Sequence, residues 1–237
     1  MQKILTWLGR REIAFWIVLL LISGSMWLFM EVADEVTEGE TLAMDEKILL
    51  SLRNPDNPED LLGPPWLEQV GKDITALGGN TVLTLLSVWV MIFLLLIHKR
   101  KLALVVLLAT GGALIASFML KSGFDRARPD LVTHATLVYT SSFPSGHSML
   151  SASTYLTLGA LLAQFQTSWR VKLLIICTSV LLTLLVGISR VYLGVHWPTD
   201  VVAGWTVGSA WALMCWYLSR QFVHEKIDSE PVSHQID

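Results

Sequence analysis

Charged side chains are scarce in this chain, since only 16% of its 237 residues are Asp, Glu, Lys or Arg. An average soluble domain has roughly 25%, so the composition argues against an ordinary water-soluble enzyme. The 53% hydrophobic content and the mean hydropathy of +0.55 exclude a disordered, collagen-like or small disulfide-rich chain. With 17 basic and 20 acidic residues, the net charge of −3 gives no sign of nucleic-acid binding.

Cysteine is scarce as well, and both cysteines, Cys177 and Cys215, lie inside apolar runs. Their spacing fits neither a zinc site nor a disulfide framework, so we interpret them as packing residues. No strand-like alternation and no internal repeat of roughly 20–50 residues is visible. These absences argue against a β-sheet protein and against a repeat architecture.

Long apolar runs, in contrast, fill much of the chain. Six segments approach the length of about 20 residues that a bilayer-spanning helix needs, and their centres carry no Lys, Arg, Asp or Glu. Because the backbone must satisfy its own hydrogen bonds in hydrocarbon, each segment is predicted to be a helix. The sequence therefore predicts an all-α, polytopic membrane bundle with six transmembrane helices. These segments are 13–32, 81–97, 102–120, 147–165, 173–188 and 201–218.

The first segment follows Lys3, Arg10 and Arg11, as a secretory signal would. A signal peptide has an apolar core of about 7–15 residues, whereas this run continues past the small residues 23–25. We therefore predict an uncleaved membrane anchor.

The domain prediction is a single membrane domain over 1–220, followed by a polar cytoplasmic tail, 221–237, that we expect to be disordered. Within the domain, 34–73 is an acidic extracytoplasmic loop. Its four prolines favour an irregular solvated loop. In the alternative, its Leu-Leu pairs and Trp66 rest at the lipid headgroup boundary.

Basic residues predict the orientation, because cytoplasmic loops carry an excess of Lys and Arg. If the N-terminus is inside, ten of the 17 basic residues are cytoplasmic, and so are both termini, as expected for a multi-pass plasma (inner) membrane protein. Of the seven outside, four crowd at the outer ends of the third and fifth segments. Such a cluster favours an anionic ligand, while the alternative is snorkelling side chains bound to lipid headgroups. The four are Lys121, Arg126, Arg128 and Arg190.

The same outer face collects the side chains that a phosphate reaction needs. Arginine and lysine bind phosphate oxygens, and Gly146 lets backbone N–H groups approach an anion at a helix N-terminus. His147 and His196 can each act as nucleophile or general acid near neutral pH. Asp200, four residues after His196, can accept a hydrogen bond from one imidazole nitrogen and leave the other free to attack phosphorus.

Three blocks carry these residues: K-x6-R-P over 121–129, P-S-G-H over 144–147 and S-R-x5-H-x3-D over 189–200. In order and internal spacing they resemble the three signature blocks of the type-2 phosphatidic acid phosphatase superfamily. The resemblance implies a membrane helical bundle and a phosphoric ester or diphosphate hydrolase. It also implies a two-step reaction through a phosphohistidine, with no metal or other cofactor.

Carried over to this sequence, the resemblance makes His196 the nucleophile, Asp200 its orienting partner and His147 the acid that protonates the leaving oxygen. The phosphate-binding residues that it implies are Lys121, Arg128, Ser145, Gly146 and Arg190.

Some residues near the blocks have no role in the family pattern. We expect Arg126 to pair with its neighbour Asp125, His134 to be solvated, and Tyr192, Trp197 and Trp205 to form an outer aromatic belt.

The substrate is predicted only as a class. The resemblance allows phosphatidic acid, phosphatidylglycerophosphate, undecaprenyl pyrophosphate and lipid A phosphates, and P-S-G-H is similar to the block of the broad bacterial phosphatidylglycerophosphatase type. Two alternatives stay open: a lipid phosphotransferase with the same intermediate, and a non-catalytic lipid-phosphate transporter or sensor. The sequence makes no prediction of oligomeric state.

Overall fold

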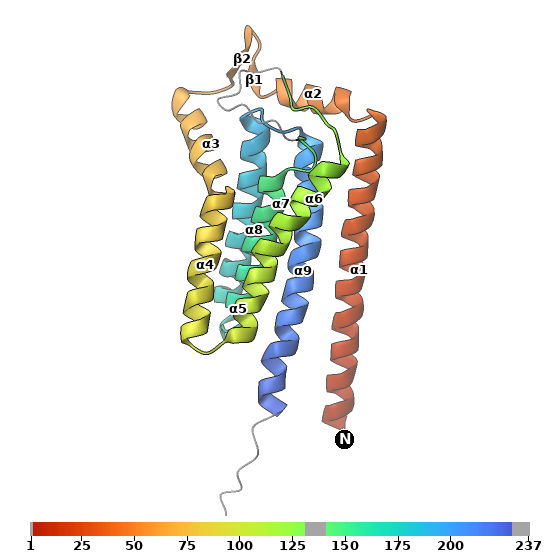
Figure 1. Ribbon diagram of the computed structural model, residues 1–237, viewed down its shortest axis with the longest axis vertical. Coiled ribbons are helices and arrows are strands. Elements are labelled where there is room, and N and C mark those ends of the chain that lie inside the picture. The colour runs from red at the N-terminus through yellow and green to blue at the C-terminus, as the bar shows by residue number, and fades with distance from the viewer. Residues whose placement is uncertain (1, 131–140, 229–237) are drawn as a thin grey trace, which may run out of the picture.

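Helices form most of the structure, a computed structural model that describes residues 2–130 and 141–228 (Figure 1). For 2–11 and 223–228 the structure describes the backbone only, and His134 lies outside the described residues. The elements are α1 (Gln2–Glu38), α2 (Leu42–Leu50), β1 (Arg53–Asn54), β2 (Asn57–Leu61), α3 (Pro65–Leu77), α4 (Asn80–Leu96), α5 (Arg100–Leu107), the π-helix η1 (Leu108–Gly112), α6 (Ala113–Gly123), α7 (Gly146–Gln164), α8 (Trp169–Tyr192) and α9 (Pro198–Asp228).

All six apolar segments are helical, as predicted. They correspond to α1, α4, the continuous α5–η1–α6 unit, α7, α8 and α9. Within the described residues, four of these units are long and apolar enough to cross a membrane, and a fifth qualifies if α3 and α4, bent by 46°, count as one span. The chain is therefore a multi-pass membrane protein. By length and composition, α7 does not qualify as a membrane span.

The reason for the exception is the position of α7 at the centre of the bundle, packed against α8 and α9 (Figure 1). Ser and Thr side chains along α7 are buried against its neighbours. Thr154 Oγ1 is 3.1 Å from Thr110 Oγ1 of η1, which is 2.5 Å from Ser87 Oγ of α4. Such hydroxyl contacts hold membrane helices together where the hydrophobic effect between helices is weak.

The π-helix in the third segment was not predicted. A π-turn disturbs the regular pattern of helical hydrogen bonds, and here Ser153 Oγ of α7 donates to the carbonyl oxygen of Ala109 at 2.7 Å. A side chain from a neighbouring helix thus satisfies a backbone group inside the bundle.

Small residues allow α9 to approach α7 closely. A Cβ added at Gly204 would lie 2.6 Å from the Ser145 carbonyl oxygen, and one at Gly208 would lie 2.4 Å from that of Met149. Both neighbours are backbone atoms that cannot rotate away. The α7–α9 contact, on which the site below is built, therefore requires glycine at both positions.

Gly208→Ala is expected to destabilise the protein by about 1–3 kcal/mol, because it forces α9 away from α7. The measurement is the thermal unfolding midpoint in detergent. Gly24→Ala in α1 is the matched control, since a Cβ at Gly24 meets nothing within 4 Å. An equal midpoint for the two variants would contradict the packing argument.

The segment 34–73 differs from the irregular loop that was expected. It contains the end of α1, α2, an antiparallel pair of β1 with β2, and the start of α3. Asp45 and Leu49 are buried in α2, and buried Arg53 donates to the backbone oxygen of Tyr192 at 3.1 Å. Packing against α8 and α9 orders the segment despite its prolines, an effect that local composition does not reveal. The side chains of Leu50, Leu62 and Trp66 are exposed. Their contact with lipid headgroups stays a prediction.

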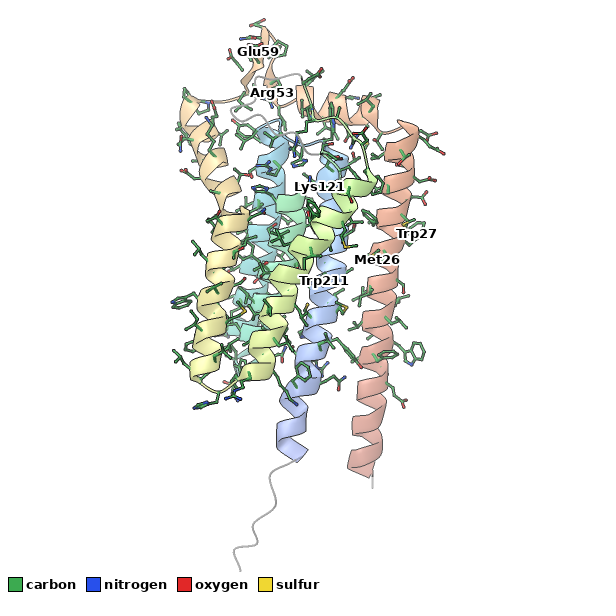
Figure 2. The ribbon with its side chains drawn as sticks, viewed as in Figure 1. Met26, Trp27, Arg53, Glu59, Lys121 and Trp211 are labelled. Carbon is green, nitrogen blue, oxygen red and sulfur yellow. The ribbon has the colours of Figure 1, made fainter. Side chains whose placement is uncertain are left out.

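Two ends of the molecule can be distinguished in Figure 1. The start of α1 and the end of α9 lie at the bottom, whereas α2, the β-strands and α3 lie at the top. The helix α9 continues to Asp228, eight residues into the expected tail. Figure 2 shows Lys121 at the upper end of α6 and Trp27 on the outer side of α1.

Candidate active site

A cavity of about 590 Å³ lies near the upper end of the bundle. Six of the eight predicted site residues line it, although they come from four parts of the chain separated by up to 75 positions. The other two, Asp200 and Ser145, are fully buried behind it. The six lining residues are Lys121, Arg128, Gly146, His147, Arg190 and His196.

His196 lies in the short connection between α8 and α9 and is almost fully buried. Its Nδ1 is 3.2 Å from Asp200 Oδ2, one helical turn further on in α9, and its Nε2 is 3.3 Å from Arg128 Nη1. A guanidinium only donates hydrogen bonds, so Nε2 is the acceptor and the proton is on Nδ1, directed at Asp200. The lone pair of Nε2 therefore faces the cationic side of the site.

The electrostatic setting keeps this imidazole neutral. Burial lowers the pKa of His196 well below its usual value, and the positive charges of Arg190, Arg128 and Lys121 lower it further. Burial also lowers the pKa of Arg128 from its ordinary value. A neutral, buried imidazole with an oriented lone pair is suited to nucleophilic attack.

Asp200 is held from two sides. Its Oδ2 accepts the backbone N–H of Trp197 at 2.9 Å in addition to the contact with His196, and its Oδ1 accepts Arg126 Nη1 at 2.7 Å. The first turn of α9 thus holds the carboxylate next to the imidazole ring of His196.

The cationic residues are also held in place from outside the signature blocks. Arg190 Nη1 donates to Thr75 Oγ1 of α3 at 3.0 Å, and Lys121 Nζ donates to the Ser141 carbonyl oxygen at 2.7 Å. Within the described part of the chain, Arg190 Nε is buried and has no acceptor. An unused guanidinium donor beside the cavity is available to a phosphate oxygen.

His147 and Gly146 form the wall at the N-terminus of α7. A Cβ at Gly146 would lie 3.2 Å from Ser117 Oγ and 3.5 Å from Lys121 Cε, so a side chain there would crowd the lysine. His147 lies beside the α3–α4 break, where its Nε2 is 3.9 Å from a Cβ built on Gly79. Asn80 of α4, the first residue after this break, also lines the cavity.

Ser145 differs from the other predicted phosphate-binding residues. It is the N-cap of α7, with its side chain accepting the Ser148 N–H at 3.5 Å and the Ser148 hydroxyl at 3.0 Å. It does not line the cavity, and its own N–H donates to the Asp200 carbonyl oxygen at 2.9 Å. Its position indicates a capping role.

Arg126 was expected to pair with Asp125, and this is wrong. Its guanidinium forms ion pairs of 2.7 Å with Asp45 and with Asp200. Asp125 is exposed, next to Arg126 in a segment without regular structure. Trp197, expected in the outer aromatic belt, is instead buried under Arg126, whose guanidinium carbon is 5.6 Å from the ring centroid.

Three polar residues at the site were missed by sequence reasoning: Asp45, Thr75 and Thr199. Asp45 and Thr75 come from the 34–77 region, where acidic and hydroxyl residues are common and no spacing distinguishes them. Only the position of Thr199, between Pro198 and Asp200, offered a signal. Among the described residues, no group of three or more His, Cys, Asp or Glu side chains is arranged to hold a metal ion.

Comparisons with known proteins identify the family of the chain. A model of the PAP2 superfamily matches residues 100–223. Phosphatidylglycerophosphatase B of Bacillus subtilis is 38% identical over 171 residues, which are 70% of this chain and 80% of that protein. An undecaprenyl-diphosphatase of Sulfolobus acidocaldarius is 32% identical over 130 residues, which are 52% of this chain and 59% of that protein.

A solved structure has the same fold. The crystal structure of a transmembrane PAP2-type phosphatidylglycerolphosphate phosphatase from Bacillus subtilis gives a TM-score of 0.72 at 27% identity, covering 89% of this chain and 98% of the other. The helical membrane fold and these matches place the chain in the class of membrane phosphatases. The chain belongs to the PAP2 superfamily, and its enzyme class is that of the phosphoric ester hydrolases.

Arg190→Ala is expected to lower kcat/KM for phosphate release by about 10²- to 10³-fold, the usual cost of removing one donor to a developing charge. Arg190→Lys recovers only part of this loss, because an ammonium cannot replace the fork of donors. The measurement is steady-state phosphate release in detergent. Arg170→Ala, exposed at the other end of α8, is the control and should match the wild type.

Proposed function

We propose that the chain is an integral-membrane lipid phosphatase that works through a phosphohistidine on His196. The observation that carries the proposal is the orientation of this ring, with Nδ1 against Asp200 and Nε2 toward Arg128 and the cavity. In the first step, a P–N bond forms to Nε2 while the bond from phosphorus to the leaving oxygen breaks. Lys121, Arg128 and Arg190 offset the charge of the transferring group.

His147 and Asp200 manage the protons. His147, which also lines the cavity, supplies a proton from its imidazolium form to the leaving alkoxide or phosphate oxygen. Asp200 retains the Nδ1–H and stabilises the positive charge that the ring gains on attack. Water then gives a proton to His147 and attacks phosphorus, the P–N bond breaks, and inorganic phosphate leaves as the His196 ring returns to its neutral form. In this proposal, each step uses only the side chains named above and water, and no metal ion.

A lipid substrate is supported by the apolar wall of the cavity. Leu114, Ile115 and Phe118 of α6 line it together with the cationic residues. The side chains of Ile115 and Phe118 are 63% and 77% exposed on the outside of the bundle, where acyl chains lie in a bilayer. A molecule with a phosphate head and an apolar chain fits both parts of this wall.

The proposed topology has six crossings, with α7 as the central one, and both termini in the cytoplasm. Supporting it, the basic flanks 99–101 and 170–172 lie at the ends of helices on the side of the termini. The active site then faces the extracytoplasmic side of the plasma membrane.

A labelling experiment tests this orientation. In a background without Cys177 and Cys215, Asp130→Cys is expected to react with an impermeant thiol reagent in intact cells. Thr167→Cys, in the turn between α7 and α8, should react only after cells are disrupted. The reverse pattern would show that the topology is inverted.

Substrate choice is tested with four purified lipids: phosphatidic acid, phosphatidylglycerophosphate, undecaprenyl pyrophosphate and a lipid A phosphate. The relatives' activities favour the second and third. We expect the purified protein in detergent to release inorganic phosphate from at least one of them without an acceptor lipid. Transfer only in the presence of an acceptor would indicate a phosphotransferase, and binding without turnover would indicate a transporter or sensor.

A further inference from the structure

A buried carboxylate from the 34–73 segment reaches the first turn of α9. Asp45 of α2 is fully buried. Its Oδ1 accepts the Thr199 N–H at 3.0 Å, and its Oδ2 accepts the Thr199 hydroxyl at 2.6 Å and Arg126 Nη2 at 2.7 Å. Asp45 thus binds the residue that directly precedes Asp200, across 154 positions of sequence.

Arg126 joins Asp45 to Asp200. One arm of its guanidinium, Nη2, donates to Asp45, and the other, Nη1, donates to Asp200 Oδ1 and to Thr199 Oγ1. The side chain is only 12% exposed and lies against the Trp197 ring. A planar, forked donor in this position fixes the relative orientation of both carboxylates.

The oxygen of Asp200 that faces His196, Oδ2, is the one that matters for the reaction. With Oδ1 held by Arg126, Oδ2 is directed at Nδ1 of His196. Arg126 also gives the buried Asp200 a counter-charge, which it needs because an unpaired buried carboxylate is costly. Asp45 in turn offsets Arg126, so that the guanidinium does not fully neutralise the carboxylate that must stabilise the imidazolium.

We propose that Asp45 and Arg126 are positioning residues that set the orientation and charge of Asp200, so that α2 is part of the catalytic apparatus. The inference rests on the proposed function, since it acts through Asp200 on His196. Neither residue reaches the phosphate cavity, so both should influence the chemical step and leave substrate binding nearly unchanged. The alternative is that the pair only fastens α2 to the bundle.

Kinetic constants of four single variants test the proposal, each purified in detergent and assayed with the lipid that the wild type hydrolyses fastest. We expect Asp45→Asn and Arg126→Lys to lower kcat by about 10- to 100-fold, the range seen for outer partners of functional ligands. KM should stay within about twofold. The matched controls are Glu46→Gln, the next residue in α2, and Asp125→Asn, the exposed neighbour of Arg126; both should retain wild-type kcat.

A second measurement separates positioning from fastening. In an Asp200→Asn background, Arg126→Lys is expected to cause no further loss of kcat, because its route to His196 is already broken. An equal loss in both backgrounds, or a kcat of Asp45→Asn equal to that of Glu46→Gln, would overturn the proposal. If Asp45→Asn is not recovered folded, Thr199→Val, which removes the hydroxyl shared by Asp45 and Arg126, takes its place with the same expected loss. A wild type that releases no phosphate would instead refute the proposed function.

Discussion

Replacing His196 with Ala is expected to lower kcat for phosphate release by about 10⁴-fold or more, since removing the nucleophile of a catalytic unit removes nearly all that the unit contributes. The structure motivates the size of the effect. In the described part of the site, His196 is the side chain that combines a neutral, buried ring with an unprotonated nitrogen facing the cationic residues. Phosphate release by the purified variant, with the same lipid as the wild type, is the measurement.

The intermediate provides a second readout. Wild-type protein quenched during turnover of a lipid with labelled phosphorus should carry label that is stable to alkali and lost in acid, as a P–N bond is. His196→Ala and the bulkier His196→Gln should carry none. The matched control is His98→Asn at the α4–α5 turn, because His98 has a φ of 58°, a conformation that Asn tolerates. Unchanged phosphate release in His196→Gln would exclude His196 as the nucleophile.

The helices of the six apolar segments were predictable from the sequence because hydrocarbon leaves the backbone little choice. The charge clusters and the spacing of the three blocks also located the cavity, since the blocks mark helix ends at the same face. Lys121, His147, Arg190 and His196 were predicted in this way, and the structure brings them together around one cavity.

The residues that hold the site residues in place were not predictable from the sequence, and Arg126 shows why. Sequence proximity suggested Asp125, but adjacent side chains of an extended segment point in different directions. The partners that Arg126 has, Asp45 and Asp200, are 81 and 74 positions away on separate helices. Contacts of this kind depend on how α2 packs over α9, and no periodicity or spacing encodes that packing. The same holds for Thr75, which holds Arg190 from α3.

The conversion Asp200→Asn is expected to lower kcat by about 10⁴-fold, the loss that the same change causes in a Ser-His-Asp triad. The variant is nearly isosteric, so α9 and its contact with α7 should be kept. In the wild type, both oxygens of Asp200 accept hydrogen bonds, one from Arg126 and one from His196. The amide of the variant has only one oxygen, so its NH2 group must replace an acceptor on one of these two sides. The ring is then free to adopt the other tautomer, in which Nε2 carries the proton and cannot attack.

Two comparisons make the Asp200 result specific to the orientation of the ring. KM for the lipid should change little, because Asp200 is buried behind the cavity and Lys121, Arg128 and Arg190 still bind the phosphate. Asp56→Asn, at the exposed tip of the β1–β2 turn, is the control for a change of one charge on this face. A loss of less than about tenfold in kcat would mean that His196 keeps its tautomer without Asp200. The hydrogen bond from Arg128 to Nε2 would then be sufficient to set the tautomer, and the arginine would both orient the nucleophile and bind the phosphate.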